Sequence, residues 1–432
     1  MGRETLLPTL FFFTPIFVSW IINRVENDGI ASMPSNELRI SEAEHKTRIE
    51  KIRGQMQRSR VGALYLTSPT RIMYVTGFSY ISTERPLALV IPRDEPLFFM
   101  APKLEYDHIR GECTLADEVY TYPDYPGRVH PIRIFAKRMA ERGLRSSVIA
   151  ADSFDGAAGG FGYRGPSLRD LMSKARFVDG RDIVDRMRLV KSKQEIRLLR
   201  ESARWCEVAH DILLENVRSG VHDALVAVRS SHEALARMLK RLGQRYVQFK
   251  IALSPVVVGF RGQVGRGSAI PHAVYSKGNI RKSDVLVSEA GVEVGGYTSE
   301  LERTVIVGKP GSKVVRYFTA MLKAQDAALH EFRPGVACSK VDDVARQSIE
   351  ASGLAEAIRH HTGHGIGLDG HEPPWLDPGD RTIMRQGMVF SCEPGLYVPG
   401  YAGFRHSDTI EITRKGMDLI THYPRGLEEL TI

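Results

Sequence analysis

The 432-residue sequence contains few cysteines, and they are far apart. The four thiols form no Cys-x-x-Cys pair: Cys113, Cys206, Cys338 and Cys392. Zinc knuckles need closely spaced thiolates and small secreted scaffolds need many cysteines, so the sequence predicts neither class. The scarcity favours a reducing compartment, and we expect a cytoplasmic location.

Clusters of basic residues are also missing, although the formal net charge is +8. Lysine and arginine are scattered along the chain instead of gathering in one segment. Because nucleic-acid recognition needs a basic patch or stripe, we expect no nucleic-acid partner. With 43% hydrophobic and 25% charged residues, the composition is that of a globular protein with two or three domains.

A long apolar run occurs only at the N-terminus, from Leu6 to Ile22. It is short for a spanning helix and contains Pro8 and Pro15, and it lacks a strongly positive flank and a small-x-small cleavage site. We interpret residues 1–33 as an apolar extension that is either a targeting segment or the result of a start codon assigned too far upstream. We expect no stable membrane partner.

Hydrophobic periodicity predicts two domains after this extension. An N-cap candidate at Ser41 and helical spacing predict a helix over residues 41–56, followed by strands at 61–67 and 72–78. Further alternation of strands and helices predicts a smaller α/β domain over residues 34–178. Long helices at 193–217 and 223–242 then precede several strand-like segments, so residues 179–432 are predicted to form an α+β domain with a mainly antiparallel sheet.

Acids and histidines accumulate in the strand-rich last third of the chain. Because a strand alternates its faces, Glu300 and Glu302 share one face, and Arg405 and Ser407 share another. Other carboxylates and imidazoles stand nearby in the sequence: Glu289, Glu393, His272, His360, His364 and His371. Such a set is typical of a site for manganese, cobalt or zinc. We also expect at least one of the histidines to be catalytic.

The motifs around these residues resemble one known family. AIPHAV, YTSELERT, HHTGHGIGLDGHEPP, GMVFSCEPG and GFRHSDT occur in the order and at the spacing of the creatinase/aminopeptidase P/prolidase family. IMYVTGF extends the resemblance into the smaller domain, so that it covers about residues 40–420. The resemblance implies an α+β pita-bread catalytic domain preceded by a creatinase-like N-terminal domain, and it implies a homodimer.

The resemblance also implies a metal site, but with altered ligands. The family's five metal ligands fall on Glu289, Glu300, His364, Glu393 and Ser407, where peptidases carry Asp at the first two positions and Glu at the last. Ser407 removes a bridging carboxylate, and two divalent ions held close together need several anionic oxygens. We therefore predict no cofactor. The alternative is one manganese, cobalt or zinc ion on Glu289, Glu300, His364 and Glu393.

The creatinase branch of the family works without metal, and the LERT segment places the sequence nearer to that branch. This resemblance implies that His272 is the general acid and base, and that Glu302 and Glu393 hold a cationic substrate group. The remaining predicted site residues are His371, as a catalytic residue, and three substrate-binding residues: Arg85, His360 and Arg405.

Three functions remain open. The preferred hypothesis is a metal-free hydrolase of a C–N bond in a small amide, urea or guanidino compound, with a histidine as general acid and base. One alternative is a metal-dependent Xaa-Pro aminopeptidase or dipeptidase. The other is a catalytically inactive binding protein on the same fold. The two enzymatic hypotheses predict a small-molecule substrate.

Overall fold

The structure is a computed structural model that describes residues 37–159, 163, 165–249, 254–274 and 278–432. The predicted apolar extension, residues 1–33, lies outside the described residues. Within the described part of the chain, no helix combines the length and the apolarity needed to cross a membrane.

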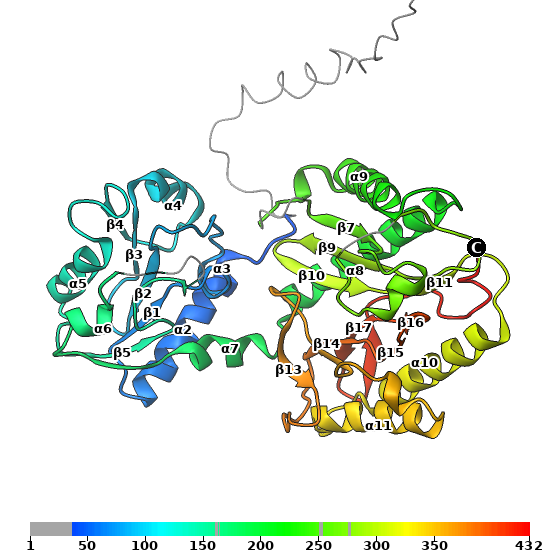
Figure 1. The fold of residues 1–432 in the computed structure, drawn as a ribbon. Helices are drawn as coiled ribbons and strands as arrows, with labels where there is room; N and C mark the ends of the chain where they lie inside the picture. Colours follow the sequence, from blue (N-terminus) through cyan, green and yellow to red (C-terminus); the bar gives the residue numbers. More distant parts are fainter. Residues whose placement is uncertain (1–36, 160–162, 164, 250–253, 275–277) are drawn as a thin grey trace, which may run out of the picture. The chain divides into compact units, whose positions relative to one another are not determined.

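The smaller N-terminal domain is built on a six-stranded mixed sheet (Figure 1). The strands lie in the order β4 (Glu118–Tyr122), β3 (Phe98–Pro102), β2 (Ala88–Pro92), β1 (Ala63–Leu66), β5 (Val148–Ala151) and β6 (Arg176–Asp179). The central β1 pairs antiparallel with β2 and parallel with β5. Its residues alternate between two hydrophobic clusters, because Leu64 packs in the cluster of α2 (Glu42–Arg58) and Tyr65 in that of α5 (Pro131–Glu141).

The segment predicted as a second strand, residues 72–78, belongs instead mainly to helix α3 (Pro69–Thr76). The Ser68 side chain caps this helix, Pro69 occupies its first position, and Gly77 ends it with a left-handed φ of 77°. These start and stop signals outweigh the strand propensity of the valine and tyrosine between them. The helix predicted before it is present as α2, with Ser41 as its N-cap.

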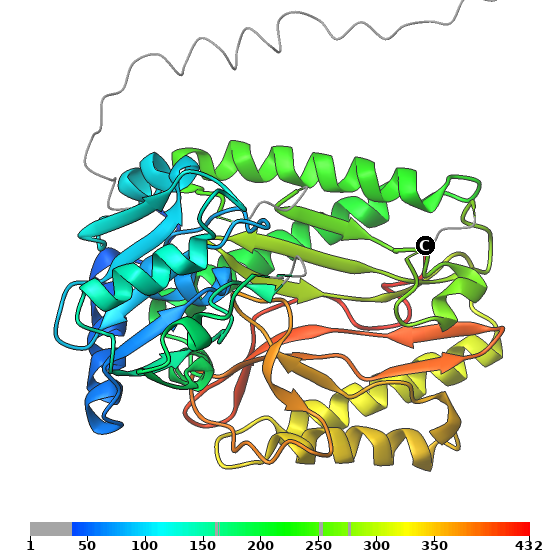
Figure 2. The same cartoon turned by 60° about the vertical axis from the view of Figure 1, so that its left-hand side comes forward.

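Helices α4 (Tyr106–Glu112), α6 (Leu168–Leu171) and α7 (Arg181–Arg188) complete this part of the chain, and the larger domain follows. Figure 2 shows its layers: α8 (Lys193–Asn216) and α9 (Asp223–Leu242) lie on one side of the strands, and α10 (Ser312–Glu331) and α11 (Cys338–Ala351) lie on the other. The three-stranded sheet next to α8 and α9 has the order β10 (Tyr297–Leu301), β9 (Glu289–Val294) and β7 (Val256–Gly259).

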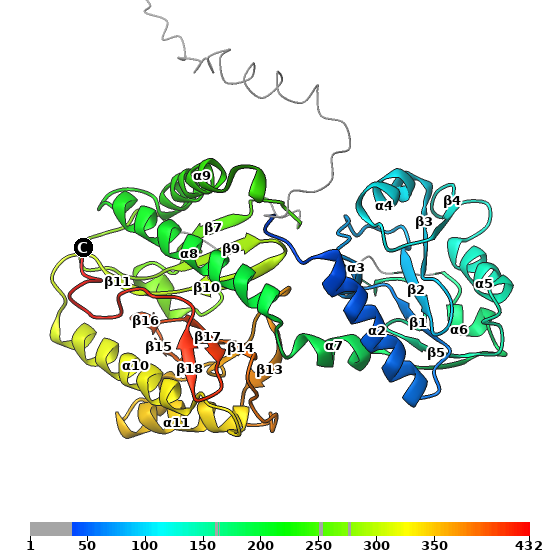
Figure 3. The same ribbon diagram turned by 180° about the vertical axis from the view of Figure 1, so that it is seen from behind.

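A second sheet carries the C-terminal part of the domain, and it is seen from behind in Figure 3. Its order is β13 (Glu372–Leu376), β12 (Gly363–Gly365), β14 (Val389–Cys392), β17 (Asp408–Ile412) and β18 (Met417–Leu419). Two shorter pairs join β8 (Val285–Val287) to β11 (Thr304–Ile306) and β15 (Gly395–Val398) to β16 (Ala402–Arg405). These strands pair antiparallel and are covered by helices on both sides (Figure 2), which is the α+β, pita-bread arrangement that the resemblance implied.

The two sheets meet where β10 ends and β17 begins. Glu302 and Ser407 exchange a pair of backbone hydrogen bonds of 3.1 Å each, which join the two segments as an isolated antiparallel bridge. This bridge brings the alternating polar residues of YTSELERT opposite those of GFRHSDT. The site described below is built on it.

Candidate active site

Glu300 is held by two hydroxyl groups from the neighbouring sheet. The Ser407 hydroxyl donates to Glu300 Oε1 at 2.7 Å, the Ser391 hydroxyl donates to the same oxygen, and the two serine oxygens lie 2.8 Å apart. Burial raises the pKa of Glu300, while His364 and the two hydroxyls oppose this rise. The Ser407 hydroxyl therefore orients the Glu300 carboxylate. A glutamate at position 407 would instead add a second negative charge beside it.

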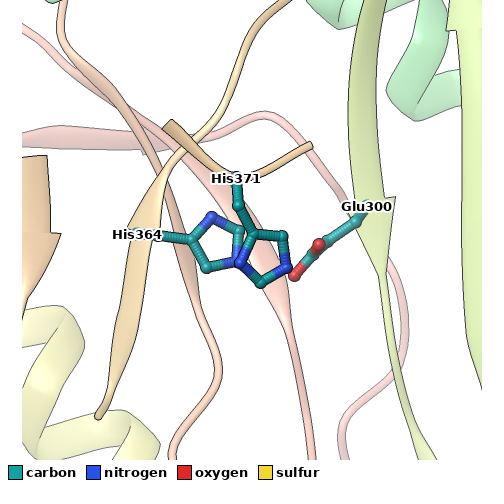
Figure 4. Close-up of side chains that lie close together, drawn as sticks. All are labelled: Glu300, His364 and His371. Atoms are coloured by element: carbon teal, nitrogen blue, oxygen red, sulfur yellow. The ribbon is translucent and has the colours of Figure 1, made fainter. Parts of the chain in front are cut away.

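His364 lies at the centre of the cluster and has no exposed surface. Its Nε2 lies 3.3 Å from Glu393 Oε1, yet it forms no hydrogen bond of good geometry within the described residues. The ring of His371 stacks on it with centroids 3.7 Å apart, and Glu300 points toward both rings (Figure 4). Although burial lowers the pKa of His364, the two carboxylates together raise it to about 9, whereas burial and His364 lower the pKa of His371 to about 4.

Glu302 is held by a bidentate pair with Arg405. Both of its carboxylate oxygens accept hydrogen bonds from the Arg405 guanidinium, which also donates to the Tyr397 hydroxyl at 2.8 Å. The Tyr397 hydroxyl lies 2.8 Å from His360 Nε2, so the chain of hydrogen bonds continues to that ring. Burial and the charge of Glu393 raise the pKa of Glu302, and Arg405 opposes them. Such a bidentate pair fixes the positions of both side chains.

Glu393 connects the two parts of the site. Its Oε2 lies 3.6 Å from Arg405 Nε, and its Oε1 faces His364. Burial disfavours the charged carboxylate, but the contact with His364 and the charge of Arg405 hold the pKa of Glu393 well below its usual range. A strongly ionised carboxylate therefore faces an imidazole nitrogen inside the domain.

The structure brings together most, but not all, of the predicted site residues. Glu289 begins β9, the strand that pairs with β10, yet its carboxylate forms an ion pair with Arg261. His272 lies on an exposed turn and is near enough to His371 to contribute to lowering the pKa of that ring. Arg85 pairs with Asp124 in the N-terminal domain, with Nε and Oδ1 2.8 Å apart.

Sequence reasoning missed three contributors: Ser391, Tyr397 and Arg261. Ser391 stands two residues before Glu393, so the alternation of a strand was a usable signal for it. Tyr397 contacts Arg405 across the β15–β16 hairpin and His360 on a separate segment, and Arg261 contacts Glu289 on a separate segment. No local pattern indicates such contacts.

The residues present fit a single divalent ion. Oxygen and nitrogen atoms of Glu300, His364 and His371 lie within 4.8 Å of one another, as do carboxylate oxygens of Glu300, Glu302 and Glu393. The buried Nε2 of His364, which faces Glu393 without a well-formed hydrogen bond, is the kind of atom that a metal would satisfy. A pair of ions fits less well, because Arg261 occupies the Glu289 carboxylate and Arg405 occupies that of Glu302.

Comparison with known proteins finds matches in both domains of the chain. Residues 197–414 match metallopeptidase family M24, and residues 48–190 match the creatinase/prolidase N-terminal domain. The chain is 28% identical over 387 residues to a Xaa-Pro dipeptidase of Lactobacillus helveticus, covering 89% of this chain and 99% of that protein.

Solved structures agree with the sequence relatives. The prolidase of Pyrococcus horikoshii superposes with a TM-score of 0.73 at 26% identity, covering 88% of this chain and 99% of that one. A prolidase of Thermococcus sibiricus gives a TM-score of 0.76 at 26% identity, covering 93% and 100%.

The comparisons bear on two predictions made from the sequence. A match to a metallopeptidase family does not support the prediction of a site without a cofactor, and it favours the alternative with a divalent metal. The prediction of a hydrolase acting on C–N bonds is confirmed. The chain belongs to metallopeptidase family M24.

Proposed function

We propose that this chain is a Xaa-Pro dipeptidase that uses one divalent metal ion, held by Glu300, His364 and Glu393. The observation that carries the proposal is the buried Nε2 of His364, which faces Glu393 Oε1 at 3.3 Å among further carboxylates but forms no hydrogen bond of good geometry in the described chain. The names of the relatives, Xaa-Pro dipeptidase and prolidase, support the substrate class. The predicted homodimer and the predicted domain boundary at residue 178 remain proposals.

A divalent ion in this site would polarise the scissile carbonyl and lower the pKa of bound water. The residues of the chain supply the rest. The hydroxyls of Ser391 and Ser407 orient Glu300. The two hydrogen bonds that Arg405 donates keep the Glu302 carboxylate in place. His272, on its exposed turn, is the group that would hand a proton to the leaving nitrogen.

A second candidate is the metal-free hydrolase of a small amide, urea or guanidino compound. The observation that favours it is the pairing of two site carboxylates with arginines, Glu289 with Arg261 and Glu302 with Arg405. Guanidinium groups already neutralise these acids, as metal ions would. In this candidate Glu393 would bind a cationic substrate group, and His272 would serve as acid and base.

Metal analysis combined with activity measurement separates the two candidates. The purified chain would be dialysed against manganese, and its bound metal and its turnover of Xaa-Pro dipeptides would be measured before and after chelation. The metal proposal predicts a single ion per chain, loss of turnover with chelator and recovery with manganese. Turnover that survives complete removal of metal would contradict it, as would turnover of guanidino or urea compounds alone.

A matched pair of variants localises the ion. Glu300→Gln is expected to abolish metal retention, because the amide oxygen is a weaker ligand than a carboxylate. Glu411→Gln changes a glutamate of β17 that pairs with Arg200 and lies outside the cluster, and it is expected to retain the ion. Equal metal content in both variants would refute the assignment of Glu300.

A further inference from the structure

Gln263 is a polar side chain without exposed surface, between β7 and the short helix η4 (Gly265–Ala269). A buried amide is costly unless its donors and its acceptor all find partners. Its Nε2 donates to the carbonyl oxygens of Ile270, at 3.2 Å, and Pro271, at 2.7 Å. Its Oε1 accepts from Arg405 Nη2 at 3.4 Å.

The backbone of Gln263 is also fixed on both sides. Its N–H donates to the carbonyl of Phe260 at 2.7 Å, and its carbonyl accepts from Val287 on β8 at 3.0 Å. The side chain therefore extends from a rigid base. Its amide bridges the site arginine and the turn that carries His272.

Within the turn Ala273 is buried and donates a backbone hydrogen bond to the Ile270 carbonyl at 3.1 Å, but the larger side chains are mostly exposed. Ile270 is 58% exposed and Val274 is 87% exposed, and His272 is exposed between them. The Pro271 carbonyl that accepts from Gln263 belongs to the peptide unit that leads into His272. The amide thus fixes this peptide plane relative to Arg405, whose guanidinium also holds Glu302.

We infer that Gln263 is a positioning residue, which holds the His272 turn against the Arg405 and Glu302 pair. The inference rests on the proposed function, in which His272 acts on the substrate. Among the described residues, the Gln263 side chain bonds only the turn and Arg405, so it does not act on the substrate directly. It acts by keeping an exposed histidine at a constant place relative to the carboxylate cluster.

Whether Gln263 anchors the His272 turn can be tested without a substrate. In Gln263→Met, which keeps the side-chain length but removes both amide functions, hydrogen exchange of residues 264–274 is expected to become at least about tenfold faster. Gln325→Met is the matched control, since Gln325 is also fully buried and bonds the carbonyls of Cys392 and His406 instead. Unchanged exchange in Gln263→Met, or equally faster exchange of this segment in the control, would overturn the inference.

The kinetic part is a double-mutant cycle on Xaa-Pro dipeptide hydrolysis. Gln263→Met is expected to lower kcat about tenfold with little change in KM, because a displaced proton donor mainly affects the transition state. In the His272→Ala background the same change is expected to have less than about a twofold effect. Equal factors in both backgrounds would overturn the inference. A wild-type chain without turnover would refute the proposed function, while the exchange experiment would still decide the anchoring.

Discussion

Arg303 is the buried cation that joins the two sheets, and its replacement by methionine gives the most direct test of how the site is supported. Its side chain has no exposed surface, and all of its donors are used. Nη1 donates to the carbonyls of Glu302, at 2.7 Å, and Ser407, at 2.9 Å, while Nη2 contacts Asp408 Oδ1 at 2.7 Å and the carbonyl of Tyr423. Nε donates to a further carbonyl, that of Pro424.

The cost of Arg303→Met follows from these contacts. Removing one partner of a buried ion pair costs about 3–5 kcal/mol, because the remaining charge is left uncompensated. Each carbonyl that loses its donor without gaining another adds about 1–3 kcal/mol. Since water and rearrangement recover part of this, we expect a loss of about 5 kcal/mol, comparable with the lower end of typical domain stabilities.

Equilibrium unfolding in urea, followed by circular dichroism, measures this loss. The double variant Arg303→Met/Asp408→Asn is the control, because it also removes the uncompensated negative charge and should recover about 2 kcal/mol or more. Gln325 and Thr421 still contact residue 408 in that variant, so its side chain keeps hydrogen-bonding partners. A loss below about 1 kcal/mol, or no recovery in the double variant, would refute the reasoning.

Two further predictions concern the helix before β1 and the strand that carries His364. Burial, followed by the charge of Arg48, lowers the pKa of His45 to about 3, so the unfolded chain binds its proton first. The stability that neutral His45 provides is complete above about pH 6.5 and is lost as the pH falls toward 3. By pH 4 the loss is about 3 kcal/mol, and urea midpoints of His45→Phe should lack this dependence. Gly363→Ala would place a Cβ 2.0 Å from the Ser391 carbonyl oxygen, so melting curves should show about 1–3 kcal/mol of destabilisation and metal retention should fall. Gly416→Ala, with open space around its Cβ, should change neither property.

Periodicity and capping made most of the elements predictable. The expected helices at 41–56, 193–217 and 223–242 correspond to α2, α8 and α9 within two residues at each end, because their apolar spacing and their N-caps agree. The failure at residues 72–78 has the same physical basis. There Ser68, Pro69 and Gly77 supply the start and stop signals of a helix, and these outweigh the β-propensity of the residues between them.

The site was predictable where strand alternation alone decides the geometry. Glu300 and Glu302 on one segment and Arg405 and Ser407 on the other do face each other, as alternation and a common bridge require. The partner of Glu289 was not predictable. Its pairing with Arg261 depends on a turn in which Arg261 adopts a left-handed φ of 49°. Gly262 signals a turn there, but nothing in the sequence indicates that Arg261 faces Glu289.

The balance of charge in the cluster is consistent with the single divalent ion that we propose. Four carboxylates belong to the site or its edge: Glu289, Glu300, Glu302 and Glu393. Two of them are paired closely with arginines, while Glu393 is 3.6 Å from Arg405, so Glu300 and Glu393 bring most of the uncompensated negative charge to the neighbourhood of His364. One divalent ion balances two carboxylates, whereas two ions would leave an excess of positive charge in a buried site. Without an ion, a proton on His364 supplies part of the same balance, which is why its pKa rises to about 9 despite burial. Ser407, which carries no charge, and the pairing of Glu289 with Arg261 both limit the negative charge of the site, and both therefore fit the proposed single ion better than a pair of ions.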